Sequence, residues 1–255
     1  MEPIDKNIKK IAVNSAELIS DRKKYFKQKM QDIPTIRVLL LGDKGVGKTS
    51  LTNLVAKSRD TPTTKSRTVG DTTWTMQVRL HEYPAPLVPL PPFPILNEFL
   101  RMGVPPPPPT TLYFVEFYDP TTELRMRRED RISFFKKVDG IILVHSLMDV
   151  SSQDSLHDWL YEPLRQIGKH RHGRSRPFLP GEHVPIMVVG TKVDLVDYTP
   201  TYHPGSIAYQ LNATEILVNC RDLHSFGEKT CNQLKLHRFL NRVVEFQLRF
   251  PLLEP

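Results

Sequence analysis

A glycine-rich loop at positions 42–49 is the feature of this sequence best suited to chemistry. It reads Gly-Asp-Lys-Gly-Val-Gly-Lys-Thr and matches the P-loop pattern G-x-x-x-x-G-K-[ST]. Glycines allow the backbone to curl so that its N–H groups point at phosphate oxygens. Lys48 can reach the β- and γ-phosphates of a nucleotide, and the Thr49 hydroxyl can bind Mg²⁺. The residues expected to hold the phosphates are Asp43, Lys44, Gly45, Val46, Gly47, Lys48, Thr49 and Ser50.

The P-loop pattern requires a strand before the loop and a helix after it, and the flanking sequence predicts both. Residues 35–41 form a short apolar run, TIRVLLL, which is typical of a buried parallel strand. A helix over residues 48–57 follows, and its N-terminus adds the positive end of the helix dipole. Two alternatives stay open: a glycine turn that binds nothing, and a P-loop that has lost its nucleotide.

The rest of the chain alternates strand and helix patterns. Such alternation predicts an α/β P-loop fold, with a six-stranded, mostly parallel sheet, one antiparallel edge strand and helices on both faces. The further expected strands are 74–83, 112–118, 140–146, 184–190 and 215–219, and the further helices are 151–168 and 228–248. The strands 74–83 and 112–118 should form a hairpin with an expanded loop, because the consecutive prolines between them cannot join a sheet.

Three further segments repeat motifs of a known family at the expected places. Thr68-Val69-Gly70 begins 68 − 48 = 20 residues after the P-loop lysine, and Phe117-Tyr118-Asp119 ends a strand. The segment 190–195 reads GTKVDL and closes an apolar strand. In order and spacing these segments resemble the small GTPases of the Ras superfamily, in its Rab and Rab-like branch, over about residues 35–250.

The resemblance implies the cofactors GTP or GDP and Mg²⁺ and assigns roles around them. Thr49, Thr68 and Asp119 would hold the metal, Thr68 directly and Asp119 through water. Asp194 would accept hydrogen bonds from guanine, which adenine cannot donate, so the site would reject ATP. The expected guanine-binding residues are Thr191, Lys192, Val193, Asp194, Asn219, Cys220 and Arg221.

Three departures from the family pattern bear on the mechanism. The usual D-x-x-G-Q segment reads DPTTE and ends at Glu123, so the glutamine that orients the attacking water is missing. We therefore expect slow or absent GTP hydrolysis and assign no catalytic residue. Thr191 replaces the asparagine that braces the P-loop, which should weaken affinity. Lys44 could add charge at the γ-phosphate, obstruct an arginine finger or point into solvent.

Composition places the chain among globular proteins and predicts additions to one large domain. It has 255 residues, a net charge of +7 and 39% apolar residues. The expected units are an amphipathic N-terminal helical extension at 1–34, a G domain at 35–250 and a tail at 251–255. Within the G domain lie a proline-rich insertion at 84–110 and a basic loop insertion at 168–183. Two cysteines cannot build a disulfide framework, so a reducing compartment is expected. The resemblance to small GTPases implies a cytoplasmic location.

Several surface features suggest partners, each with a plainer alternative. Five consecutive prolines begin at Pro105 and end at Pro109. They could bind an SH3, WW or EVH1 domain or form a stiff exposed loop. The N-terminal helix could contact a membrane without a lipid anchor, pack on the sheet or pair with a second copy as a homodimer. The basic stretch 165–176 lacks interleaved aromatic residues, so nucleic-acid binding is not expected.

The nucleotide-binding motifs favour a guanine-nucleotide-dependent switch that recruits effector proteins through its nucleotide-sensitive surface. The resemblance implies that such a switch works in trafficking or signalling. The main alternative is a scaffold whose binding ignores nucleotide. An ATP-using P-loop enzyme and a nucleic-acid-binding protein are the remaining hypotheses.

Overall fold

The structure is a computed structural model, and it describes seven segments of the chain. They are residues 33–56, 65–69, 72–84, 110–119, 128–172, 183–197 and 206–251. The expected N-terminal helix, the prolines 105–109, the segment 120–123, most of the basic insertion and the last four residues lie outside them. The predictions made on those segments stay predictions.

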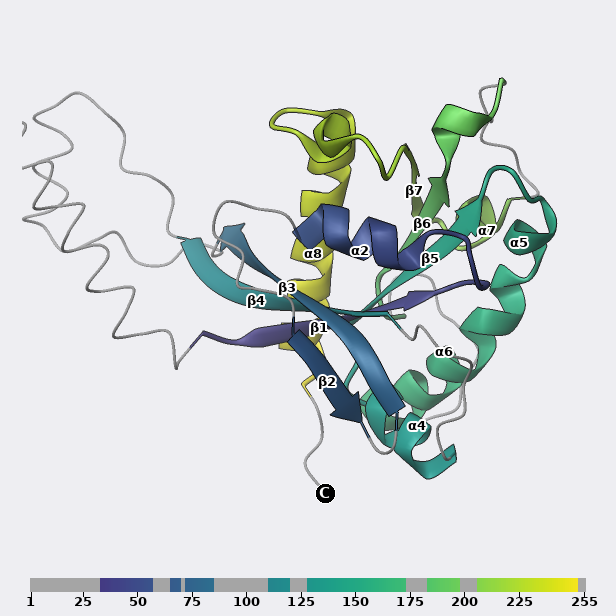
Figure 1. Cartoon of the computed structure of the whole chain (residues 1–255). Helices are drawn as coiled ribbons and strands as arrows, with labels where there is room; N and C mark the ends of the chain where they lie inside the picture. Colours follow the sequence, from purple (N-terminus) through teal and green to yellow (C-terminus); the bar gives the residue numbers. More distant parts are fainter. Residues whose placement is uncertain are drawn as a thin grey trace, which may run out of the picture. The chain divides into compact units, whose positions relative to one another are not determined.

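A twisted sheet of seven strands, in the order β2-β3-β4-β1-β5-β6-β7, forms the centre of the domain (Figure 1). The five strands from β4 to β7 in this order run parallel, and β3 pairs antiparallel with β4 over ten residue pairs. The strands are β1 (Thr35–Leu41), β2 (Lys65–Val69), β3 (Thr72–Pro84), β4 (Thr110–Asp119), β5 (Gly140–Ser146), β6 (Ile186–Thr191) and β7 (Thr214–Val218). The α/β fold and the antiparallel pairing of the two strands that flank the proline-rich insertion are confirmed.

The sheet differs from the expected one at its antiparallel edge. The six expected strands are all present, but β2 is an additional strand that pairs antiparallel with β3. The strand expected at the edge, β3, therefore lies one position inside it. The sequence of β2, KSRTV, is short and mostly polar and lacks the apolar run by which a buried strand is recognised. An edge strand needs only one neighbour, so such a segment can join the sheet without apolar residues.

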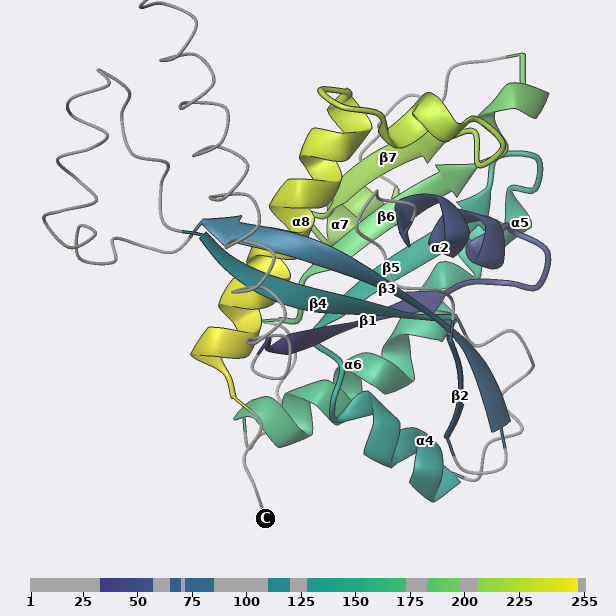
Figure 2. The ribbon, with the colours of Figure 1, turned by 60° about the vertical axis from the view of Figure 1, so that its left-hand side comes forward.

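Helices cover both faces of the sheet and divide the core into two layers (Figure 2). The first core layer lies under α2 and α8, and the second core layer lies under α4, α6 and the short α7. The helices are α2 (Lys48–Ala56), α4 (Arg128–Phe135), α5 (Ser151–Asp154), α6 (Leu156–His172), α7 (Ile207–Gln210) and α8 (Cys231–Arg249), with short 3₁₀ turns η2 (Val193–Leu195) and η3 (Leu223–Phe226). Every residue of β5 and β6 is buried, as expected for central parallel strands covered on both faces.

The helix expected over 151–168 is instead two helices joined at one residue. α5 ends at Asp154 and α6 begins at Leu156, so Ser155 stands between them. Leu156 is fully buried in the second core layer, which fixes the first turn of α6 in place. This junction lies near the P-loop and is important for the site described below.

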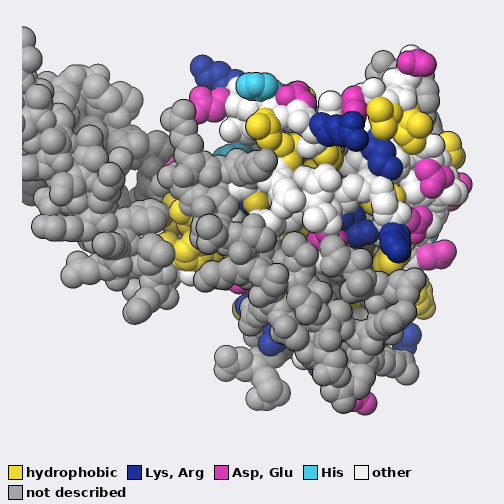
Figure 3. All heavy atoms as spheres, viewed as in Figure 1, with side chains coloured by type: hydrophobic (Ala, Val, Ile, Leu, Met, Phe, Trp, Pro, Cys, Tyr) yellow, Lys and Arg dark blue, Asp and Glu magenta, His cyan; other side chains and the backbone are white. Residues whose placement is uncertain are grey.

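The surface of the described residues carries mixed charge. On the face seen in Figure 3, Lys and Arg side chains are interspersed with Asp and Glu. In the segments that the structure describes, no helix is long and apolar enough to cross a membrane.

Candidate functional site

The predicted site residues meet at one edge of the sheet, where the parallel strands end. The P-loop follows the end of β1, Asp119 is the last residue of β4, and Thr191 is the last residue of β6. Carboxyl ends of parallel strands share an edge, which is where α/β sheets bind ligands. The topology therefore brings together residues that lie far apart in the sequence.

Glycines shape the P-loop at the end of β1. Gly42, Gly45 and Gly47 have φ values of +141°, +82° and +104°, a region that other residues avoid. At Gly42 a side chain is also excluded by space, because a Cβ atom there would lie 2.0 Å from the carbonyl oxygen of Val144. The loop thus starts in direct backbone contact with β5, and its curled shape depends on glycine.

Lys48 begins α2 and points its ammonium back across the loop. Its Nζ donates hydrogen bonds to the carbonyl oxygens of Gly42 and Asp43, at 2.9 Å and 2.8 Å. Burial lowers the pKa of Lys48, whereas the negative charges of Asp119 and Asp43 raise it. These two carboxylates therefore support the charged form of an amine that is partly removed from water.

Thr49 and Asp119, two of the residues predicted to bind the metal, contact each other. The Thr49 hydroxyl donates to Asp119 Oδ2 at 2.5 Å, although 70 residues separate them in the sequence. Asp119 is fully buried, and its second oxygen, Oδ1, has no hydrogen-bond partner within the described residues. Burial raises the pKa of Asp119, and the Thr49 hydroxyl and the charge of Lys48 lower it.

An unpartnered, buried carboxylate oxygen beside a threonine hydroxyl fits a divalent cation. Mg²⁺ in phosphate-binding sites takes one or two protein oxygens and completes its shell with water and phosphate. In the described part of the chain no three His, Cys, Asp or Glu residues come close enough to enclose a metal by themselves. The arrangement suits a cation that arrives with a phosphate ligand.

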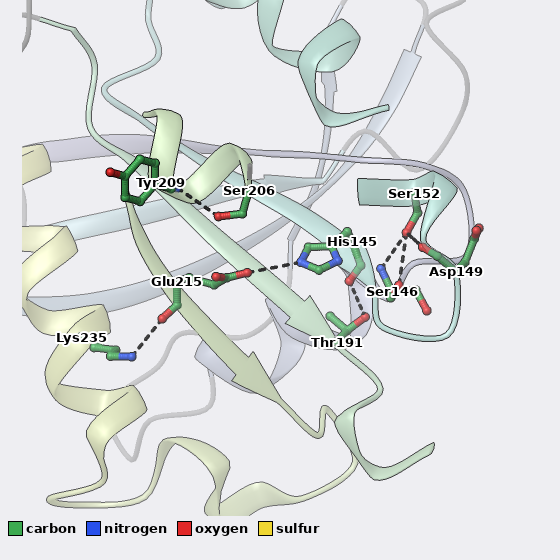
Figure 4. A network of polar contacts seen from close by, with 9 residues as sticks. All are labelled: His145, Ser146, Asp149, Ser152, Thr191, Ser206, Tyr209, Glu215 and Lys235. Atoms are coloured by element: carbon green, nitrogen blue, oxygen red, sulfur yellow. Dashed lines mark hydrogen bonds and ion pairs between the residues drawn. The ribbon is translucent and has the colours of Figure 1, made fainter. Parts of the chain in front are cut away.

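Thr191 contacts the P-loop from the end of β6. Its hydroxyl lies 2.5 Å from the carbonyl oxygen of Val46. It also lies 2.9 Å from the carbonyl oxygen of His145, a contact drawn in Figure 4. Thr191 also lies against Gly47, where a Cβ atom would be 3.5 Å from the threonine hydroxyl. A threonine at this position therefore still braces the loop, through a shorter side chain than asparagine.

Two loops at the far side of the site hold the predicted guanine-binding residues. Lys192 takes a left-handed conformation, with φ of 60°, and starts η2, which carries the exposed Asp194. In the other loop, the Asn219 side chain accepts the N–H of Arg221 at 2.9 Å. Burial raises the pKa of Cys220 to about 11, and the charge of Asp194 contributes to that shift. β7, which precedes the second loop, pairs parallel with β6, so both loops follow the ends of neighbouring strands.

The comparisons with known proteins agree with this geometry. No protein-family model matches the chain. Rab-like protein 3 of Xenopus tropicalis is 27% identical over 233 residues, which cover 85% of this chain and 87% of that protein. Rab-like protein 3 of Mus musculus is 26% identical over the same shares. The chain is a homologue of Rab-like small GTPases.

A more distant relative points the same way. Small GTPase-like protein LIP2 of Arabidopsis thaliana is 29% identical over 160 residues, which cover 63% of this chain and 43% of that protein. The two Rab-like protein 3 sequences confirm the resemblance to the Rab-like branch that the motifs indicated, and LIP2 agrees at the broader level of small GTPases.

The structure brings together most of the expected site residues but not all of them. The P-loop, Asp119 and the two loops that carry the predicted guanine-binding residues meet at one edge of the sheet. Thr68 lies in β2, opposite Thr73 of β3, and only its backbone is described. Its role as a metal ligand stays a prediction. The side chain of Lys44 is exposed to solvent.

Asp43 has two partners that the sequence motifs did not reveal. Its Oδ2 accepts the Ser155 hydroxyl at 2.6 Å, and its Oδ1 accepts the indole N–H of Trp159 at 2.7 Å. The carboxylate therefore faces the start of α6. These contacts join positions 112 and 116 residues apart, and no sequence pattern described above pairs them.

Proposed function

We propose that this Rab-like chain is a guanine-nucleotide-dependent switch that binds GTP or GDP with Mg²⁺. Nucleotide would be held by the P-loop, the metal by Thr49 and Asp119 with Thr68, and guanine by Asp194 and its neighbours. The single observation that supports this most strongly is the contact between the Thr49 hydroxyl and the buried Asp119, whose other oxygen lacks a partner among the described residues. Most buried side-chain oxygens in proteins have a hydrogen-bond partner, so an unpartnered one beside a threonine hydroxyl supports a ligand at this place.

The bound nucleotide would order the surface that recruits effector proteins. GTP contacts would fix the segment that carries Thr68 and the segment after β4, and loss of those contacts would release them. We place this activity in trafficking or signalling in the cytoplasm. The proline segment 105–109, the N-terminal helix and pairing of two copies are further proposed contact sites for partners or membranes.

Hydrolysis of GTP is proposed to be slow or absent. Glu123 stands where the water-orienting glutamine of the family is expected, and a carboxylate beside phosphate oxygens is repelled unless it is protonated or turned away. The segment that carries Glu123 lies outside the described residues, so this proposal depends on the sequence alone.

The test is to purify the protein without added nucleotide, denature it and identify what is released. Near-stoichiometric GTP would support a guanine site with failed hydrolysis. A predominance of GDP would overturn the proposal of slow hydrolysis and keep the switch. Absence of any nucleotide, together with no binding of added GTP at millimolar Mg²⁺, would overturn the switch.

Base selectivity has its own control within the same site. Asp194→Asn replaces one of the two carboxylate acceptors for guanine with an NH₂ donor but leaves the P-loop and Asp119 unchanged. We expect it to lose the preference for GTP over ATP, whereas wild type prefers GTP. An unaltered preference would exclude Asp194 as the guanine contact.

The alternative of a scaffold that ignores nucleotide is favoured by one observation, the loss of both glycine and glutamine from the DPTTE segment. Partner binding measured with GTP, with GDP and with the nucleotide-free protein separates the two functions. Equal affinity in all three states would favour the scaffold.

A further inference from the structure

The carboxylate of Asp43 connects the P-loop to the start of α6. Asp43 follows Gly42 directly, so its backbone belongs to the loop that faces phosphate, while its side chain points to another element. Both carboxylate oxygens are engaged, one by Ser155 and one by Trp159, at 2.6 Å and 2.7 Å. Hydrogen bonds to an ionised acceptor are short and stronger than neutral ones.

The element at the other end of this contact is fixed in the core. Trp159 packs against the second core layer, and Leu156, one residue after Ser155, is fully buried in it. The opposite side of the loop is held by Thr191, which reaches the carbonyl oxygen of Val46. The Asp43 side chain therefore attaches the first half of a glycine-rich loop to a helix that the core holds in place.

The direction of the carboxylate has an electrostatic consequence. A carboxylate that faced the phosphate site would repel the ligand, because two negative charges would approach without water between them. Ser155 and Trp159 hold this charge on the α6 side, yet it remains close enough to Lys48 to raise the pKa of that amine. Asp43 therefore keeps its negative charge away from the phosphate site and still stabilises the charged form of Lys48.

We propose that Asp43 is a positioning residue for phosphate binding, which acts by tying the P-loop to α6 through Ser155 and Trp159. This inference rests on the proposed function, since it concerns the same loop. The Asp43 side chain faces α6 and leaves phosphate contact to the backbone. It sets where the loop N–H groups and Lys48 lie when the β-phosphate arrives.

The experiment compares five variants with wild type, one of which is a control. Trp159→Phe removes the indole donor and keeps an aromatic ring in the core layer, Asp43→Ala removes both acceptors, and the double variant combines them. Asp43→Asn keeps an oxygen for the indole and can donate to the Ser155 hydroxyl. Tyr161→Phe is the matched control, because Tyr161 lies on α6 and is 70% exposed.

Two readouts separate positioning from general stability. The first is the ratio of GMP to GDP dissociation constants, which isolates the contribution of the β-phosphate. The second is amide hydrogen exchange of residues 43–47 in the nucleotide-free protein. We expect Trp159→Phe and Asp43→Ala to shrink the ratio about threefold to tenfold and to speed exchange in the loop, since the net loss of a typical hydrogen bond has effects of this size. Asp43→Asn should restore most of the ratio, and Tyr161→Phe should change neither readout.

The double variant decides whether the two residues act together. A loss no larger than that of Asp43→Ala supports the tether, because the second substitution removes a bond that is already gone. The tether is wrong if the losses in the ratio from the two single variants add fully in the double variant. It is also wrong if both single variants match wild type in the ratio and in the exchange rates. If Asp43→Ala does not fold, Trp159→Phe alone carries the test.

Failure of the proposed function would look different. Suppose that wild type binds no guanine nucleotide, but Trp159→Phe exchanges the amides of residues 43–47 faster than wild type. The proposed switch would then be wrong, and the tether would still stand as a brace of the P-loop. A wild type that binds GDP, with variants that match it in both readouts, keeps the switch and overturns the tether.

Discussion

At the level of single residues, Gly42 has the least freedom in the P-loop. A Cβ atom there would lie 2.0 Å from the backbone oxygen of Val144, and φ is +141°. We expect Gly42→Ala to lower the free energy of unfolding by about 3 kcal/mol or more, because backbone must move to admit the methyl group. Urea unfolding measures this directly.

Gly45→Ala is the matched control for Gly42→Ala. Position 45 also has a positive φ, +82°, but a Cβ atom added there would meet no other atom within 4 Å. The cost should be only that of the left-handed conformation, about 1 kcal/mol. Equal losses for the two variants would contradict the steric argument.

Thr191 gives a second prediction at this scale. Thr191→Val keeps the shape of the side chain but removes the hydroxyl that reaches the carbonyl oxygens of Val46 and His145. Leaving a buried acceptor unsatisfied costs about 1–3 kcal/mol, so we expect lower stability and weaker GDP binding. Thr191→Ser keeps the hydroxyl and should stay close to wild type in GDP affinity. The brace is excluded if valine and serine behave alike in a GDP titration.

How far the sequence predicts the site depends on how local each contact is. The P-loop is contiguous, so its pattern predicts its shape and the strand and helix that flank it. Asp119 lies 70 residues from Thr49, and only the resemblance to a family placed them together. Asp43 and Trp159 also lie far apart in the sequence, 116 residues from each other. Their contact belongs to no motif, so the sequence does not predict it.

At the level of elements, β3 presents a polar side to the helices that cover it. Gln77 donates to Asn53 of α2 at 2.6 Å, and Arg79 donates to the carbonyl oxygen of Val55 at 3.0 Å. His81, further along the same side, contacts Asn241 of α8 at 2.8 Å. Alternation along a strand predicts which residues share a side. It does not show that polar residues will be the buried ones, and β2 was missed because its sequence is polar as well.

His81 makes the attachment of β3 to α8 sensitive to acid. The residue is 1% exposed, its Nδ1 has no hydrogen-bond partner among the described residues, and burial lowers its pKa from 6.5 to about 4. The ring of His237, on α8, lies with its centroid 5.2 Å from the centroid of the His81 ring. The hydrogen bond to Asn241 raises the pKa of His81, and the charges of His237 and Arg79 lower it further. Burial also lowers the pKa of His237, with Arg79 lowering it and Glu82 raising it.

The sign of the effect follows from the depressed pKa. Between pH 6.5 and 4 the unfolded chain binds a proton at His81 and the folded chain does not, so acid favours unfolding. The free energy of unfolding should fall by up to about 3 kcal/mol across this window from His81 alone, at about 1.4 kcal/mol per pKa unit. His81→Gln can still hydrogen-bond to Asn241 but does not titrate. We expect it to lose less stability than wild type between about pH 7 and pH 4.5 in urea unfolding, and parallel curves would count against His81.

At the level of the whole molecule, the two cysteines report on different parts of the fold. Cys231 is exposed at the start of α8. Cys220 is partly buried against the first core layer, to which Phe226 also packs, and burial raises the pKa of its thiol to about 11. A thiol reacts as thiolate, and at about pH 8 a pKa near 11 leaves only about one molecule in a thousand in that form.

We therefore expect a thiol reagent at about pH 8 to modify Cys231 rapidly and Cys220 slowly, in two separate phases. The slow phase should depend on opening of the loop between β7 and η3, because Cys220 must leave the core layer before it can ionise easily. Cys231→Ser isolates that phase, and low concentrations of urea should speed it. A single fast phase in which both thiols are modified would show that the loop between β7 and η3 opens readily in the nucleotide-free protein. Two phases would show that the loop between β7 and η3 stays packed on the first core layer, against which α8 also packs.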